Sequence, residues 1–318
     1  MDTKVNRAFY TALDTMLLAE HGALPTGSED SFVRALGVNA ALVGVFDGCG
    51  GLGSRVYAEL DGRTGAYIAA RIASGAVYDW FQTLRDLQEL PAPDELTASL
   101  RSHLDEALKI AASRGAGASR MRGSMVRDFP TTAAVALAHE ADGSILLDLF
   151  WAGDSRVYLL DAAGLAQLTH DDLAGQDALS NLSNDAALTN VISSDGNYTL
   201  HHTRIALEHP ALIIAATDGV FGYVRTPMEL EWLLLRVIAK AETPDLFRRQ
   251  IQAVLGEIAE DDFALNLMSF YHGSWDTLRS ISYVDRAKEL EHRYIRPLMA
   301  DRTDAHVQAL WEIGRAHV

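Results

Sequence analysis

The chain has little cysteine, little proline and no long apolar run. Its 318 residues include one cysteine, Cys49, which excludes an internal disulfide and a zinc site built from several cysteines. No stretch approaches the ~18 consecutive apolar residues of a membrane-spanning helix. Asp14 interrupts the best apolar stretch near the N-terminus, so we predict no signal peptide. We therefore expect a cytoplasmic, bacterial protein with no membrane partner.

Basic residues are also scarce. The chain has 27 Lys and Arg against 43 Asp and Glu, which gives a net charge of −16. Because affinity for nucleic acid depends on basic side chains that neutralise phosphates, this balance argues against a nucleic-acid partner. The composition is otherwise that of a globular protein, with 48% apolar residues and only 8 prolines. An excess of carboxylates is compatible with a site for hard cations.

Short apolar runs bounded by Gly, Asp or Pro predict strands. They lie at 41–46, 131–138, 145–151, 157–160, 212–216 and 263–270. Only five residues separate the third run from the fourth, so those two strands should be antiparallel neighbours, which disfavours a doubly wound parallel sheet. Four helices are expected between and after these strands. They begin near 65, 96, 227 and 244. Together the patterns predict an α+β fold class.

Three segments fall outside this alternation. The polar stretch from about 170 to 202 predicts a functional loop, in which His201 and His202 would be exposed. The chain after residue 272 has helical but no strand patterning. We therefore divide it into a main domain at 1–272, a helical C-terminal extension at 273–311 and a last segment at 312–318. That segment matches a translated sequencing adapter, so the natural protein is expected to continue past Trp311.

Acidic residues follow or precede several of the predicted strands. Asp47, Asp154, Asp218 and the pair Asp261 and Asp262 lie at such ends, and Glu29 and Asp30 lie just upstream of the first strand. Strand ends are rigid places to hold the oxygen ligands of a metal ion. Each Asp-Gly pair alone is more typical of a turn. Their occurrence together favours a metal site.

In this order the acidic segments resemble the metal-dependent Ser/Thr protein phosphatases, the PPM or type 2C family, in a bacterial branch. The resemblance covers residues 15 to 272. It rests on SEDSF at 28–32, VFDGCGG at 45–51, FPTTA at 129–133, AGDSRVY at 152–158, ATDGVF at 216–221 and DDFAL at 261–265. The resemblance implies an α-β-β-α sandwich, in which helices flank two central antiparallel sheets. It also implies two Mn²⁺ or Mg²⁺ ions at one end.

The resemblance assigns roles to individual residues. Asp47 would bridge both ions, the Gly48 carbonyl and Glu29 would hold one of them, and Asp218 and Asp261 would hold the other. The catalytic set would then be Asp47, Asp218 and Asp261. Two divalent ions lower the pKa of a shared water, and the resulting hydroxide can attack phosphorus in line.

Two more acidic residues receive outer roles by the same resemblance. Asp30 would accept a hydrogen bond from metal-bound water, and Asp154 would hold a third ion. The substrates implied are phosphoserine and phosphothreonine on protein partners, in signalling opposite a Ser/Thr kinase.

The sequence departs from the family pattern in two places. Cys49 stands where many members have a His, and we interpret it as a packed bystander. Pro25 stands where the family has its phosphate-binding Arg, for which Arg55 or Arg34 could substitute. Two alternatives therefore stay open: a regulatory pseudophosphatase that acts as a binding module, and a phosphatase for small molecules.

Overall fold

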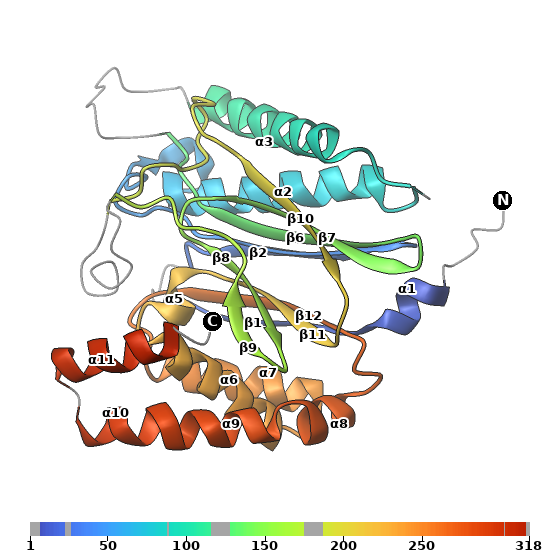
Figure 1. Cartoon of the computed structure of the whole chain (residues 1–318). Helices are drawn as coiled ribbons and strands as arrows, with labels where there is room; N and C mark the ends of the chain where they lie inside the picture. The colour runs from blue at the N-terminus through green and yellow to red at the C-terminus, as the bar shows by residue number, and fades with distance from the viewer. Residues whose placement is uncertain are drawn as a thin grey trace.

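Two five-stranded antiparallel sheets form the centre of the molecule (Figure 1). The computed structural model describes residues 7–22, 27–87, 89–115, 128–174, 187–301 and 303–315. The first sheet has the order β1-β12-β11-β8-β9, at Leu13–His21, Phe263–Phe270, Ala211–Ala216, Arg156–Asp161 and Gly164–Gln167. The second has the order β10-β7-β6-β3-β2, at His201–Leu207, Ser144–Ala152, Ala133–Ala141, Ala40–Phe46 and Ser31–Leu36.

Helices cover the outer face of each sheet (Figure 1). On the second sheet lie α2 and α3, at Gly65–Leu84 and Pro93–Gly115. On the first lie α6 and α7, at Pro227–Lys240 and Pro244–Gly256, each capped by a Thr side chain that accepts a hydrogen bond from a first-turn amide. The short helices α1 and α5 are at Arg7–Ala12 and Asp218–Phe221, and the two-stranded sheet pairs β4 with β5 at Val56–Tyr57 and Arg63–Thr64. The predicted α-β-β-α sandwich is confirmed.

Apolar side chains fill three layers. One cluster lies between the sheets, where small residues of β6 such as Ala134 and Ala136 meet Ile213 and Met268 of the first sheet. The other two lie beneath the helix pairs on the outer faces. β3 is buried along its whole length, because it lies inside its sheet with apolar layers on both faces. The sandwich therefore provides a rigid support for the strand ends.

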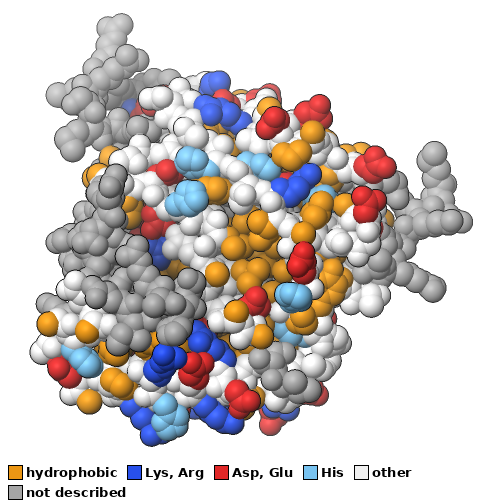
Figure 2. Space-filling view, in the orientation of Figure 1, with side chains coloured by type: hydrophobic (Ala, Val, Ile, Leu, Met, Phe, Trp, Pro, Cys, Tyr) orange, Lys and Arg blue, Asp and Glu red, His pale blue; other side chains and the backbone are white. Residues whose placement is uncertain are grey.

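The chain after β12 forms a further helical layer outside α6 (Figure 1). It comprises α8, α9, α10 and α11, at Trp275–Thr277, Val284–Leu290, Arg296–Ala300 and Asp304–Arg315. Arg286 of this layer forms an ion pair with the buried Glu231 of α6, with 2.7 Å between Nε and Oε1. Figure 2 shows charged side chains of both signs along the rim where these helices lie, and apolar side chains gathered in the middle of that face.

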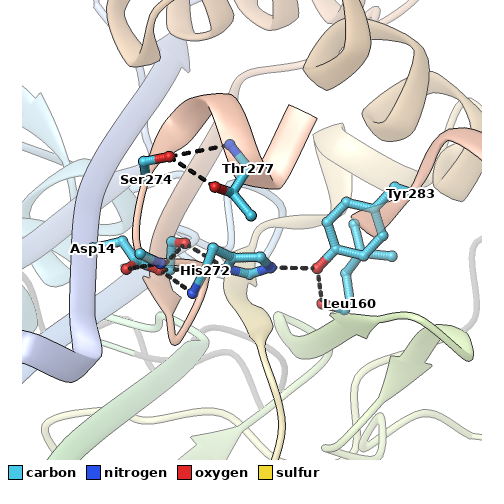
Figure 3. A network of polar contacts seen from close by, with 8 residues as sticks. Asp14, Leu160, His272, Ser274, Thr277 and Tyr283 are labelled. Atoms are coloured by element: carbon cyan, nitrogen blue, oxygen red, sulfur yellow. Dashed lines mark hydrogen bonds and ion pairs between the residues drawn. The ribbon is translucent and has the colours of Figure 1, made fainter. Parts of the chain in front are cut away.

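A buried polar network joins this layer to β1 and β8 of the first sheet (Figure 3). The Asp14 carboxylate of β1 accepts hydrogen bonds from the His272 amide at 2.9 Å and from Ser269 Oγ at 3.0 Å. Tyr283 lies before α9 and donates its hydroxyl proton to the Leu160 carbonyl at 3.1 Å, so it accepts the hydrogen bond from His272 Nε2 at 3.0 Å. The His272 side chain is fully buried. Its hydrogen bonds connect β1 to Tyr283, which in turn is bonded to β8.

Within the part of the chain that the structure describes, no helix has the length and apolar character needed to cross a membrane.

Candidate functional site

The acidic segments meet at one end of the sandwich, on the side of α5 in Figure 1. Asp47 directly follows β3, and Asp218 is the first residue of α5, separated from the end of β11 by Thr217 alone. Because neighbouring strands are antiparallel, the end of β11 lies beside the start of β12, which Asp261 and Asp262 precede. The register between β2 and β3 places Ser31 opposite Phe46, so Glu29 and Asp30 arrive at the same end.

The carboxylates of this end lie close enough to perturb one another. Burial raises the pKa of Asp47 well above its ordinary value, and the charges of Asp218, Asp30 and Asp154 raise it further. Burial likewise raises the pKa of Asp30, with added repulsion from Asp218. Burial also raises the pKa of Asp218, and the charge of Asp261 raises it further. These five side chains therefore form one interacting group, which we call the acidic cluster.

Asp154 has a carboxylate oxygen for which the described part of the chain provides no hydrogen-bond partner. Its Oδ1 atom is buried, and no group among the described residues forms a hydrogen bond with it. Burial and the charges of Asp218 and Asp171 raise its pKa to about 7. A buried carboxylate oxygen without a partner costs roughly 1–3 kcal/mol or more. An acceptor of this kind fits a cation.

The donor set of the acidic cluster is that of a hard divalent ion. Mg²⁺ and Mn²⁺ prefer carboxylate, carbonyl and water oxygens, and the cluster offers carboxylates from several rigid strand ends. None of its five carboxylates forms an ion pair with a described Lys, Arg or His. In the described ranges, no three His, Cys, Asp or Glu side chains are close enough together to hold an ion without rearrangement.

Buried threonine hydroxyls, whose role the sequence pattern does not reveal, hold the cluster in place. Thr217 Oγ1 donates to Asp30 Oδ2 at 2.7 Å. Thr131 Oγ1 donates to the Asp47 carbonyl at 2.8 Å, and the Asp47 amide donates to Thr132 Oγ1 at 3.3 Å. Both threonines belong to the FPTTA segment, and Thr217 precedes the Asp-Gly of ATDGVF. Their position in these two segments is the only feature of the sequence that could have pointed to them.

Glu29 is positioned by two further groups. The Asp262 carboxylate accepts a hydrogen bond from the Glu29 amide at 2.6 Å, so Asp262 holds the backbone of this segment. The Thr64 hydroxyl, which caps α2, donates to the Glu29 carboxylate. The start of α2 also contacts Gly48, where an added Cβ would lie 2.5 Å from the Ala66 carbonyl oxygen. Glycine is therefore required directly after Asp47.

The next glycines provide a matched test of the Glu29 position. A Cβ at Gly50 would lie 2.7 Å from Glu29 Oε2, whereas one at Gly51 would meet nothing within 4 Å. We expect Gly50→Ala to displace the Glu29 carboxylate and to weaken Mn²⁺ binding by about 10- to 100-fold, the usual effect of disturbing a ligand's support. Titration calorimetry would measure this. Gly51→Ala is the control, and equal affinities for the two variants would contradict the expected role.

Cys49 packs beside the cluster as a neutral thiol. Its Sγ lies 3.9 Å from the Asp47 carbonyl oxygen. Burial raises the pKa of the thiol well above its ordinary value, and the charges of Asp47, Asp154 and Asp218 raise it further. The structure thus disfavours a thiolate at this position.

The two arginines proposed as phosphate ligands lie differently from each other. Arg34 occupies the middle of β2 opposite Val43, and its Nη1 donates to the Met16 carbonyl at 3.4 Å, so the structure does not bring it to the acidic cluster. Arg55 lies over the Tyr57 ring and forms an ion pair with Asp128 at 3.5 Å. Pro25 lies outside the described residues.

The structure describes both ends of the polar loop. The Asp172 carboxylate connects them through hydrogen bonds. Asp172 accepts hydrogen bonds from the Gly153 amide at 2.9 Å, from Asn190 Nδ2 at 2.6 Å and from His201 Nε2 at 3.0 Å. The expectation that His201 and His202 are exposed in a loop is wrong. Both lie in β10 and are partly buried, because Asp172 and Asp148 supply hydrogen-bond acceptors for them. Residues 175–186 of the loop lie outside the described residues.

Solved structures of bacterial phosphatases share this fold. The serine/threonine phosphatase PstP/Ppp of Mycobacterium tuberculosis matches with a TM-score of 0.57 and 17% identity, over 81% of this chain and 98% of that one. Stp1 of Staphylococcus aureus matches with a TM-score of 0.57 and 14% identity, over 82% and 97%. The catalytic domain of PstP in complex with two manganese ions matches with a TM-score of 0.53 and 17% identity, over 82% and 99%. A comparison with curated protein sequences finds no match.

The family model for protein phosphatase 2C matches residues 25–258, which is most of the chain. The matched range includes the acidic cluster up to Asp218 and both sheets except β1 and β12. Sequence and fold agree, and the chain belongs to the protein phosphatase 2C family.

Proposed function

We propose that this protein is a cytoplasmic, metal-dependent phosphatase that hydrolyses phosphoserine and phosphothreonine on proteins. The main support is the acidic cluster: five carboxylates at one end of the sandwich, whose charges help to raise the pKa of Asp47, Asp30 and Asp218, with no ion pair to a described basic side chain. Keeping like charges this close is costly unless a cation binds them. The structure with two manganese ions is of a protein with the same fold.

The types of oxygen donor at this end would suit two divalent ions and a third, weaker one. Asp47, the Gly48 carbonyl and Glu29 would hold one ion, and Asp218 and Asp261 the other. The third would take the partnerless oxygen of Asp154. When bound, Mn²⁺ or Mg²⁺ lowers the pKa of a water enough to make it a nucleophile near neutral pH.

The chain's own residues prepare the water and its surroundings. Asp30 would accept a hydrogen bond from water in the cluster through its carboxylate, which Thr217 fixes from the other side. Fixed acceptors need no reorganisation when the reaction begins, and this is how such sites lower a barrier. Cys49 stays protonated beside them, so attack by water rather than by a thiolate is favoured.

A direct test measures hydrolysis of an aryl phosphate and of a phosphothreonine peptide, with Mn²⁺ or with a chelator. We expect turnover of both substrates in Mn²⁺ and none in chelator, because the proposed nucleophile forms only with the ions bound. Adding Mn²⁺ back in excess of the chelator should restore activity, which separates metal loss from unfolding.

Two other outcomes would redirect the proposal. Mn²⁺ binding without turnover of either substrate would favour a regulatory pseudophosphatase, for which Pro25 at the family's Arg position is the specific observation. Cleavage of the aryl phosphate without the peptide would favour small-molecule substrates. Turnover that persists in chelator would refute the metal-dependent mechanism itself.

A further inference from the structure

A mostly buried positive charge lies beside the acidic cluster. Arg156 is the first residue of β8 and follows Asp154 by two positions. In the first sheet it lies opposite Ala216, two residues before Asp218. Its Cζ is 3.8 Å from the centre of the Phe221 ring of α5, the helix that begins with Asp218. With a side chain that is 17% exposed, Arg156 therefore lies next to two of the proposed metal ligands.

The charge of Arg156 acts on both of these carboxylates. Burial raises the pKa of Asp154 to about 7, and the positive charge of Arg156 limits the rise. Burial also raises the pKa of Asp218, and Arg156 again acts against the rise. A buried guanidinium with several carboxylates nearby pairs with one of them, because an unpaired buried charge is costly. Which carboxylate it pairs with decides what is left for a metal ion.

Arg156 pairs with Asp171, at the start of the polar loop. Nε donates to Asp171 Oδ1 at 2.9 Å and Nη2 donates to Oδ2 at 2.6 Å, which is the parallel two-bond geometry of a strong pair. The remaining nitrogen, Nη1, donates to the Tyr158 hydroxyl at 3.0 Å. Gln167 Nε2 also donates to Asp171 Oδ1, at 2.9 Å. These contacts and the Phe221 ring hold the guanidinium in one orientation.

Asp154 is closer to Arg156 in the chain but receives no such bond. Its Oδ1 atom is buried and has no hydrogen-bond partner among the described residues. A guanidinium has five donors and could satisfy this oxygen. It would then neutralise the carboxylate and occupy the place that a metal ion needs. The pair between Arg156 and Asp171 therefore leaves Asp154 available to a cation.

The turn that carries Asp154 is held by other contacts. The Asp172 amide donates to the Gly153 carbonyl at 3.0 Å, and Asp172 Oδ2 accepts from the Gly153 amide at 2.9 Å. On the other side of the turn, the Ser155 hydroxyl is 2.6 Å from Thr132 Oγ1. Loss of the guanidinium pair should therefore leave this turn in place.

We propose that Asp171 is a positioning residue that neutralises Arg156 and holds it away from Asp154. Without Asp171, the guanidinium would turn to the buried Oδ1 atom of Asp154 and compete with the third, weaker ion. The inference rests on the proposed function and adds to it a residue that decides whether a metal ion or an arginine binds Asp154.

Mn²⁺ binding to the full chain, measured by titration calorimetry, tests this role. Asp171→Asn should weaken the weakest Mn²⁺ site about 10- to 100-fold, because a charge-assisted hydrogen bond must break before the ion binds. The double variant Asp171→Asn with Arg156→Gln should regain nearly the wild-type affinity, since the competing cation is gone. Asp245→Asn is the matched control, because it also removes an aspartate paired with an arginine, Arg248 at 2.8 Å, but on the exposed face of α7.

A crystal structure of metal-free Asp171→Asn provides a readout that depends on neither metal nor activity. The Arg156 guanidinium should lie about 3 Å from Asp154 Oδ1. A guanidinium that keeps its wild-type position would overturn the inference. So would a double variant that binds Mn²⁺ as weakly as the single one, since Asp171 would then have a structural role. If no variant hydrolyses any phosphate while the guanidinium moves and the affinities follow the expected order, the proposed function fails and the positioning role stands.

Discussion

Asp47→Asn should abolish phosphatase turnover and, in chelator, should raise the melting temperature. Turnover in Mn²⁺ is expected to fall at least ~100-fold, the usual effect of removing one fixed electrostatic group from an active site. Without metal, the same substitution removes one charge from a group whose members repel one another. Each kcal/mol of repulsion relieved should raise Tm by roughly 2 °C in a chain of this size.

Kinetics with an aryl phosphate and thermal unfolding in chelator provide the two readouts. Asp285→Asn is the control, because the Asp285 side chain is fully exposed and distant in sequence from the cluster. A variant that loses activity and also becomes less stable in chelator would indicate that Asp47 holds the fold rather than a metal. Undiminished turnover would contradict its assignment to the catalytic set.

Asp148→Asn should cause the largest loss of stability. The Asp148 carboxylate on β7 is fully buried and accepts hydrogen bonds from three basic side chains, at distances of 2.7 to 3.0 Å. These side chains are His139, His202 and Arg204. An amide can neither neutralise Arg204 nor accept all of these bonds. Removing one partner of a buried ion pair typically costs about 3–5 kcal/mol, and urea unfolding at neutral pH would measure it.

Because of the same carboxylate, we expect the free energy of unfolding of the wild type to fall at acid pH. Burial alone would raise the pKa of Asp148, but hydrogen bonds from its three partners lower it from 3.8 to about 2. Because the pKa is depressed in the folded state, the stabilisation is complete above about pH 4 and is lost as the pH falls towards 2. The shift corresponds to about 2 kcal/mol.

The difference in unfolding free energy between wild type and Asp148→Asn isolates this contribution from that of other carboxylates. It should shrink between about pH 4 and pH 2 and stay constant near neutrality. Asp285→Asn again provides the control. A difference that is the same at pH 3 and pH 7 would mean that the Asp148 charge is not what stabilises this part of the sheet.

Much of the sandwich could be predicted because its inner strands are uniformly apolar. The expected strand at 263–270 coincides with β12, and that at 41–46 lies one residue inside β3. β1, β2 and β10 escaped prediction because they lie at sheet edges and carry polar side chains. β10 reads HHTRIAL, and its His202 and Arg204 become acceptable in a sheet only through the buried Asp148, which is 54 residues away from His202.

The candidate site also has a part that the sequence predicts and a part that it does not. The acidic residues are visible in the sequence because each stands at the end of a strand run, and the structure brings five of them together. Their supports are not visible, since Thr217 reaches Asp30 across 187 positions and Asp262 reaches the Glu29 amide across 233. Contacts between segments so distant in sequence depend on how the strands are ordered in the sheets, which no local pattern records.

The edge position of β1 has a consequence for synthesis on the ribosome. β1 leaves the ribosome among the first elements. It can pair only when β12, one of the last strands, has also been synthesised. Asp14 likewise waits for Ser269 and His272, which donate hydrogen bonds to its carboxylate. At about 5–20 residues per second, the roughly 250 residues between them take on the order of 10–50 s to translate. During that interval the nascent chain carries an unpaired, partly apolar strand, which is a natural substrate for chaperones that bind extended segments.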